Sequence, residues 1–153
     1  MIWSKRCGKK ETETMRSFVI DASVALKWFP VGDEEFVEES RNVWKAICRR
    51  SIQAYAPTFL LVEVTNILAK KKKVNALVLK KIVNSLINSE IKFVSLETSD
   101  LERLGDLVVK YGMTAYDAQY VLLAEQQKCK VMAADRDFLK LKALAVSVAE
   151  MAG

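Results

Sequence analysis

The chain has 153 residues, 51% of them hydrophobic and 28% charged, and its formal net charge of +5 favours polyanions as partners. It contains no histidine, which excludes a Ser-His-Asp triad, a Cys-His pair and histidine-ligated zinc. The three cysteines lie far apart, and no apolar run is long enough to cross a membrane, so we expect a cytoplasmic protein with reduced thiols and no membrane contact.

The first fourteen residues, 1–14, are polar and charged and show little periodicity. We expect them to form a poorly ordered N-terminal extension, followed by a single domain over residues 15–153. Met15 directly precedes the first predicted strand and could serve as an alternative start of the chain.

Strands and helices alternate along the rest of the chain, because short apolar runs predict buried strands and apolar residues at helical spacing predict helices. The predicted strands cover residues 17–21, 53–56, 92–96, 130–134 and, less clearly marked, 145–148. The predicted helices cover residues 23–28, 34–50, 58–72, 75–89, 99–112, 114–127 and 137–142.

Capping and stop signals mark several of these boundaries. Ser23 and Thr58 are predicted to cap the helices that they open. Ser99 and Glu102 have the spacing of a capping box, and the helix that they open is predicted to end near Gly112.

The alternation predicts an α/β fold, a three-layer α/β/α sandwich around a mainly parallel sheet of four to five short strands. Strands in such a sheet are covered by helices on both faces, which explains why they are solid apolar runs. Ligands of such folds bind beyond the carboxyl ends of the strands.

Four carboxylates lie in apolar surroundings, where a charge is costly to bury. Asp21 and Asp135 end two apolar strands, Asp117 lies in the first turn of a helix, and Glu63 lies about one turn into another. All four can therefore point to one edge of the sheet, where clustered carboxylates would form a site for Mg²⁺ or Mn²⁺.

Each of these acids also has a purely local interpretation. Asp21 could cap the next helix, Glu63 could be a satisfied internal glutamate, and Asp135 could begin a turn. Asp117 could pair with Thr114, three residues earlier. Four coincidences at one edge of the sheet are less probable than a shared site, so we favour the site.

The segments that carry these acids resemble a known family. They are VIDAS at 19–23, EVTNIL at 63–68, TAYDAQY at 114–120 and ADRDF at 134–138. They are similar to the PIN domain, and most closely to VapC-type toxins of prokaryotic toxin–antitoxin pairs, over residues 16–150. The resemblance implies a PIN-like fold and a metal-dependent endoribonuclease that uses Asp21, Glu63, Asp117 and Asp135.

The resemblance also suggests a role for each acid. We expect Asp21 and Asp117 to be the main ligands of Mg²⁺ or Mn²⁺, while Glu63 and Asp135 bind through water or position the nucleophile. Ser23 matches a family position that often supports the first aspartate.

One position departs from the family pattern. Family members often carry Thr, Ser or Asn two residues before the last aspartate, whereas this chain has Ala133, so one supporting hydrogen bond should be missing. Asp137 is either an acid that compensates behind the site or the N-cap of the last helix.

Several side chains are candidates for RNA contact. Lys27 and Arg136 lie next to the predicted site and either contact phosphate or remain solvated. The run Lys70–Lys73 is a solvated helix end, an RNA contact, or both. Tyr116 and Tyr120 could stack on bases, although we expect at least one of them to pack in the core.

The resemblance implies two kinds of protein partner, a small antitoxin and a second copy of the chain in a homodimer. The alternative function is that of a catalytically weak PIN-like RNA-binding or scaffold protein, which would need no complete set of four acids.

Overall fold

The computed structural model describes residues 14–29, 32–141 and 143–151. At its centre is a five-stranded sheet in the order β3-β2-β1-β4-β5, in which every neighbouring pair is parallel. The strands are β1 (Ser17–Ile20), β2 (Gln53–Pro57), β3 (Lys92–Val94), β4 (Lys130–Ala133) and β5 (Ala145–Ser147). The predicted α/β class and the predicted parallel sheet are therefore confirmed.

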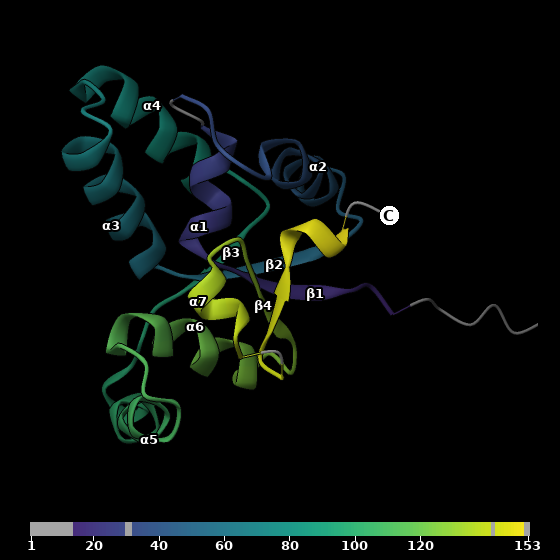
Figure 1. Cartoon of the computed structure of the whole chain (residues 1–153), viewed down its shortest axis with the longest axis vertical. Coiled ribbons are helices and arrows are strands. Elements are labelled where there is room, and N and C mark those ends of the chain that lie inside the picture. The colour runs from purple at the N-terminus through teal and green to yellow at the C-terminus, as the bar shows by residue number, and fades with distance from the viewer. Residues whose placement is uncertain (1–13, 30–31, 142, 152–153) are drawn as a thin grey trace, which may run out of the picture.

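Helices cover both faces of this sheet. They are α1 (Ala22–Ala25), α2 (Val37–Cys48), α3 (Phe59–Asn66), α4 (Ala76–Ile87), α5 (Leu101–Tyr111), α6 (Ala115–Gln126) and α7 (Arg136–Leu139). Figure 1 shows α5 and α6 on one side of the sheet and α1 to α4 on the other. Helix α6 contacts β1, β2 and β4, the three central strands of the sheet.

The central strands are buried on both faces, as their uninterrupted apolar sequences predict. In β1, Val19 and Ile20 have no exposed surface, and the same is true of Val131 and Met132 in β4. Ile20 pairs with Met132 in the parallel register of these two strands. Because β1 and β4 are neighbours, the residues that follow them emerge side by side.

The N-caps of α1 and α3 differ from the prediction. The N-cap of α1 is Asp21 and not Ser23, because the Asp21 carboxylate accepts a hydrogen bond from the Ser23 backbone N–H. Thr58 does occupy the N-cap of α3, but its side chain makes no capping hydrogen bond. Its hydroxyl instead lies 3.4 Å from the Ser95 hydroxyl.

The start of α5 also differs, because a 3₁₀ turn over Thr98–Asp100 precedes it. Glu97, directly before this turn, forms its capping box with Asp100, and the Glu97 backbone N–H donates to Asp100 Oδ2 at 3.0 Å. Ser99 and Glu102 therefore lie inside the helical segment, and they are not its capping box. The end of α5 agrees with the prediction, since Gly112 has the left-handed conformation (φ 61°) that closes a helix.

Other short helical turns follow or lengthen the main helices. A 3₁₀ turn, Leu26–Trp28, continues α1, and a π-helical turn, Ile67–Lys71, continues α3 to nearly the predicted end of that helix. Helix α2 begins later than predicted because Phe36, directly before it, is left-handed (φ 60°). A final 3₁₀ turn, Val148–Met151, follows β5.

The predicted N-terminal extension, residues 1–14, lies outside the described residues except for Thr14. Within the described part of the chain, no helix combines the length and the apolar character needed to cross a bilayer.

Candidate functional site

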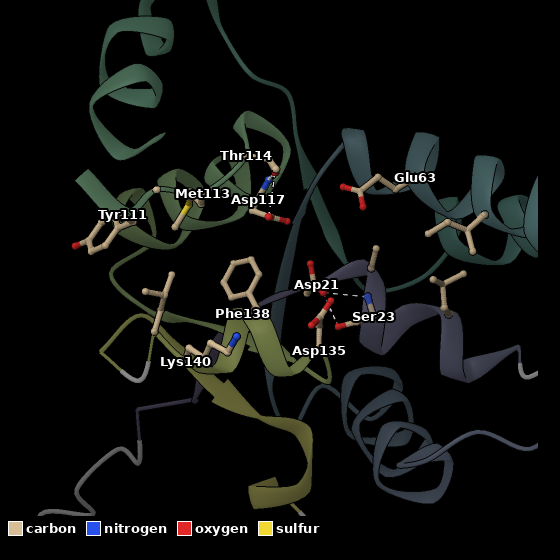
Figure 2. Close-up of a pocket in the computed structure, with 15 residues that line it drawn as sticks. Asp21, Ser23, Glu63, Tyr111, Met113, Thr114, Asp117, Asp135, Phe138 and Lys140 are labelled. Atoms are coloured by element: carbon tan, nitrogen blue, oxygen red, sulfur yellow. Dashed lines mark hydrogen bonds between the residues drawn. The ribbon is translucent and has the colours of Figure 1, made fainter. Parts of the chain in front are cut away.

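A cavity of about 520 Å³ lies at the carboxyl ends of the central strands, and all four predicted acids line it. Asp21 follows β1, Asp135 follows β4, Glu63 projects from α3 and Asp117 from the first turn of α6. Figure 2 shows Glu63 and Asp117 pointing toward each other from their two helices, with Asp21 between and below them. The structure therefore brings together the residues that the sequence placed at one edge of the sheet.

Asp21 is the most enclosed of the four acids, with 7% of its surface exposed. Its backbone N–H donates to the carbonyl of Met132 at 3.0 Å, which fixes the end of β1 against β4. Burial raises the pKa of the Asp21 carboxyl, hydrogen bonds from Ser23 oppose that rise, and the negative charge of Asp117 adds to it. The pKa of Asp21 is raised on balance, so its ionised form gains from a nearby cation.

Ser23 holds Asp21 in place and also ties the two central strands together. Its hydroxyl donates to Asp21 Oδ2 at 2.5 Å and accepts from the Ala134 backbone N–H at 3.0 Å. A single side chain thus supports the first aspartate, as expected for its position, and anchors the turn that leads from β4 to Asp135. This contact lies next to Ala133, where the sequence indicated a missing hydrogen bond.

Glu63 is half-buried and shares a hydrogen bond with a residue that the sequence did not associate with it. The Tyr120 hydroxyl donates to Glu63 Oε1 at 3.1 Å. Burial and the nearby charge of Asp21 raise the pKa of Glu63 to about 7, although the Tyr120 hydrogen bond lowers it. Near neutral pH, Glu63 therefore exchanges between its protonated and ionised forms.

Tyr120 itself is fully buried, so the core interpretation of this tyrosine is the correct one. Two features of the sequence around Tyr120 could have indicated that its hydroxyl contacts an acid of the site. Tyr120 lies three residues after Asp117 and thus on the same side of α6. It is also a polar-tipped residue in an apolar run, and a buried tyrosine hydroxyl usually requires a partner.

Asp117 is held by the residue that caps α6. The Asp117 backbone N–H donates to Thr114 Oγ1 at 3.1 Å, and the Thr114 hydroxyl donates to Asp117 Oδ2 at 3.0 Å. The local interpretations of Asp21 and Asp117, as capping partners, are thus both observed. They coexist with the place of both acids in the cavity, because each carboxylate is oriented by its local hydrogen bonds.

Asp135 lines the same cavity and is exposed. Asp137 is the second residue of α7, so it is not the N-cap of that helix. Its side chain lies outside the described part of the structure, so its compensating role behind the site stays a prediction.

The carboxylate oxygens that line this cavity are the ligands that a hard divalent cation such as Mg²⁺ prefers. Among the described residues, no three acidic or cysteine side chains are grouped so that they could hold a metal ion by themselves. Mg²⁺, however, usually binds through one or two carboxylates and keeps several waters, so it needs no closed cage of protein ligands. The charge of Asp117 raises the pKa of both Asp21 and Glu63, and the charge of Asp21 raises that of Glu63 as well; a bound cation would relieve this repulsion.

The two basic side chains predicted to contact RNA differ in their exposure. Lys27 is largely buried, and its Nζ lies 3.8 Å from Glu34. Arg136 is exposed at the start of α7. Lys140, which the sequence did not single out, lines the cavity at the end opposite Glu63 (Figure 2).

Comparison with known proteins gives a family and a set of similar folds. The model of the PIN domain family matches residues 18–144. No curated protein matches the chain in sequence.

Three solved structures are similar over most of their length. The crystal structure of PAE2754 from Pyrobaculum aerophilum has a TM-score of 0.67 at 19% identity, covering 90% of this chain and 87% of that one. A toxin–antitoxin complex from Klebsiella pneumoniae has a TM-score of 0.64 at 14% identity, with 86% and 97% covered. The sarcin–ricin loop cleaving toxin VapC20 from Mycobacterium tuberculosis has a TM-score of 0.65 at 12% identity, with 80% and 93% covered. These likenesses confirm the predicted PIN-like fold.

Proposed function

This chain belongs to the PIN domain family, and we propose that it is a metal-dependent endoribonuclease that cleaves RNA phosphodiester bonds as the toxin of a toxin–antitoxin pair. The observation that carries the proposal is the set of four carboxylates lining one cavity beyond the carboxyl ends of β1 and β4. The toxins among the structures with a similar fold support the assignment, including one described as cleaving the sarcin–ricin loop.

Asp21 and Asp117 would hold Mg²⁺ or Mn²⁺ directly, and Glu63 and Asp135 would do so through water. When bound, such a cation lowers the pKa of a water molecule and neutralises charge on the reacting phosphate. Ser23 and Thr114 keep the two direct ligands oriented by the hydrogen bonds already described.

Glu63 is suited to proton transfer in this reaction. Its Oε1 is occupied by the Tyr120 hydroxyl, which leaves Oε2 to take a proton from the attacking water. In the metal-free protein its pKa is about 7, and a cation bound at Asp21 and Asp117 would lower that pKa, so the carboxylate would be ionised and able to accept a proton at neutral pH. The buried ring of Tyr120 keeps this carboxylate fixed during the transfer.

The experiment that tests the proposal is RNA cleavage by purified wild-type, Asp21→Ala and Asp117→Ala proteins. Cleavage should be abolished by EDTA, restored by Mn²⁺, and absent from both variants while they remain folded. Asp106→Ala is the matched control, since it removes an exposed carboxylate on α5 that lies 3.9 Å from Arg103. Undiminished cleavage by a clean Asp21→Ala preparation would refute the assignment.

The second candidate is a catalytically weak PIN-like RNA-binding or scaffold protein. The capping roles of Asp21 and Asp117 favour it, because they account for both acids without a metal. RNA binding without any Mn²⁺-dependent cleavage would select this candidate over the first.

We also propose that a small antitoxin binds this chain, that the chain forms a homodimer, and that it acts in the cytoplasm, where its RNA substrate is found. The toxin–antitoxin complex among the similar folds supports the antitoxin. Expression of the wild-type chain alone should then be toxic and that of Asp21→Ala should not, and the mass of the purified protein in solution tests the dimer.

A further inference from the structure

An exposed aromatic stack stands next to the acidic cavity. Tyr116 is 61% exposed, yet its ring lies nearly parallel to that of Phe59, with 5.2 Å between the ring centroids and 8° between the planes. Phe59 thus fixes the orientation of Tyr116, and much of the remaining ring surface faces solvent. Of the two tyrosines that the sequence offered for base stacking, Tyr120 is in the core and Tyr116 is accessible.

The stack joins the two helix starts that carry two of the acids. Phe59 is the first residue of α3, four residues before Glu63 and thus on the same side of the helix. Tyr116 directly precedes Asp117 in the first turn of α6. Neither ring is among the described residues that line the cavity, but each lies within about one helical turn of an acid that does, Glu63 on α3 and Asp117 on α6, and these two carboxylates face each other in Figure 2.

We propose that Tyr116, backed by Phe59, is the stacking platform for an unpaired nucleobase of the RNA, next to the phosphate that the acids act on. This inference rests on the proposed function and names how the same site holds its substrate. Aromatic rings stack on any base, and sequence-tolerant binding of single strands uses such platforms. RNA-binding proteins generally recognise bases that are unstacked from their neighbours, which a rigid exposed ring can receive.

Two further features favour RNA over a protein segment on this stack. The exposed hydroxyls of Thr58 and Ser95 lie 3.4 Å apart, and Thr58 directly precedes Phe59, so polar groups that can bind a sugar or phosphate lie at the same helix start as the stack. The net charge of +5 also attracts a polyanion. Because Phe59 already orders the tyrosine ring, little side-chain freedom is lost on binding.

The test measures RNA binding in EDTA, where no cleavage occurs, by fluorescence anisotropy of a short fluorescein-labelled single-stranded RNA of mixed sequence. Tyr116→Ala should bind about tenfold more weakly than wild type, the loss typical of one stacked base. Tyr116→Phe keeps the ring and should bind like wild type. Val109→Ala is the matched control, since it shortens an apolar side chain on α5 that is 84% exposed, and it should also bind like wild type.

Two further measurements locate the contact. Duplex RNA should bind wild type and Tyr116→Ala equally, because its paired bases cannot stack on a side chain. Irradiation of wild type with the same single-stranded RNA carrying 4-thiouridine should give a cross-link on the peptide that contains Tyr116. This second measurement needs no variant, so it decides the matter even if Tyr116→Ala fails to fold.

The outcomes separate this inference from the nuclease proposal. Equal binding of single-stranded RNA by wild type and Tyr116→Ala would overturn the platform, whatever their cleavage activities, and so would an effect of Tyr116→Ala confined to a protein partner. Weaker binding by Tyr116→Ala, combined with no metal-dependent cleavage by wild type, would support the platform and refute the nuclease. If both proposals hold, Tyr116→Ala should raise KM for single-stranded RNA with little change in kcat.

Discussion

Burial does more to set the ionisation of Glu63 than any single neighbour. The pKa of about 7 results first from burial and then from the charge of Asp21, while the Tyr120 hydroxyl partly offsets both. From the sequence, Glu63 could be placed on a helix next to the cavity, but its pKa could not be predicted. That value depends on how the fold buries the side chain and on Asp21 and Tyr120, which lie 42 and 57 residues away along the chain.

This pKa predicts how the stability of the metal-free protein depends on pH. In the folded protein Glu63 has a pKa of about 7, against 4.5 for an unperturbed glutamate, so between these values the folded state binds more protons than the unfolded state. Stability therefore falls as pH rises from 4.5 to about 7, and the raised pKa of Asp21 acts in the same direction. Thermal unfolding in EDTA should show that Glu63→Gln reduces this fall and melts a few degrees above wild type at the alkaline end.

The matched control is Glu102→Gln, which neutralises an exposed glutamate on α5. It should keep the wild-type dependence on pH. Parallel curves for wild type and Glu63→Gln would contradict the raised pKa.

The Tyr120 hydroxyl gives a second prediction at the scale of a residue. Tyr120→Phe keeps the buried ring and removes the donor to Glu63, so the fold should survive while the carboxylate loses its fixed orientation. Outer partners of metal ligands typically contribute 10- to 100-fold to metal affinity or activity, so we expect Mn²⁺ binding about tenfold weaker. Isothermal titration calorimetry measures this affinity. Tyr55→Phe, in β2 and away from the cavity, is the control, and an unchanged affinity in Tyr120→Phe would argue against a positioning role.

At the scale of an element, the helix starts determine where the acids point. Thr114 was correctly predicted to open α6, because it directly precedes the helix and its hydroxyl accepts from the Asp117 N–H while donating to the Asp117 carboxylate. The prediction for Ser23 was wrong, since Asp21 lies two residues earlier and its carboxylate reaches the Ser23 N–H first. The Ser23 hydroxyl is also engaged by Ala134, 111 residues away, a contact that no local pattern reveals.

The cap of α6 should therefore affect both stability and activity. Thr114→Ala removes the hydroxyl that accepts from the Asp117 N–H and donates to its carboxylate. We expect a loss of about 1 kcal/mol in the free energy of unfolding, the usual contribution of an N-cap, together with weaker metal-dependent cleavage. Thr114→Ser should restore both, as urea denaturation and RNA cleavage would show.

Helix α4 provides a matched control for this prediction. Asn75 caps α4 in the same way, with its side chain accepting from the Val78 N–H at 3.0 Å, and it does not line the cavity. Asn75→Ala should cost about the same stability while leaving cleavage unchanged. Equal losses of cleavage in the two variants would mean that Thr114 acts only through global stability.

At the scale of the whole molecule, the sheet order explains why acids distant in sequence share one cavity. Alternating strands and helices predicted a parallel sheet, but the alternation alone does not order the strands, because strand pairing is a long-range choice. In the order β3-β2-β1-β4-β5, β1 and β4 are neighbours, so Asp21 and Asp135 emerge from adjacent strand ends. Helices α3 and α6 then bring Glu63 and Asp117 to the same edge, from opposite sides of the sheet (Figure 1).

Because the acids come from separate parts of the fold, an ion that binds them should stabilise the folded chain as a whole. A ligand that binds only the folded state adds about 2.7 kcal/mol of stability at a concentration of 100 times its Kd. Mn²⁺ should thus raise the melting temperature of wild type by several degrees, and the rise should grow with pH up to about 7 as Glu63 ionises.

Asp21→Asn should melt higher than wild type in EDTA, since the substitution removes a buried charge, yet gain much less from Mn²⁺. Differential scanning fluorimetry over a series of Mn²⁺ concentrations checks both parts, with Asp106→Asn as the control that keeps the wild-type response. An equal rise in wild type and Asp21→Asn would place the ion elsewhere on the protein.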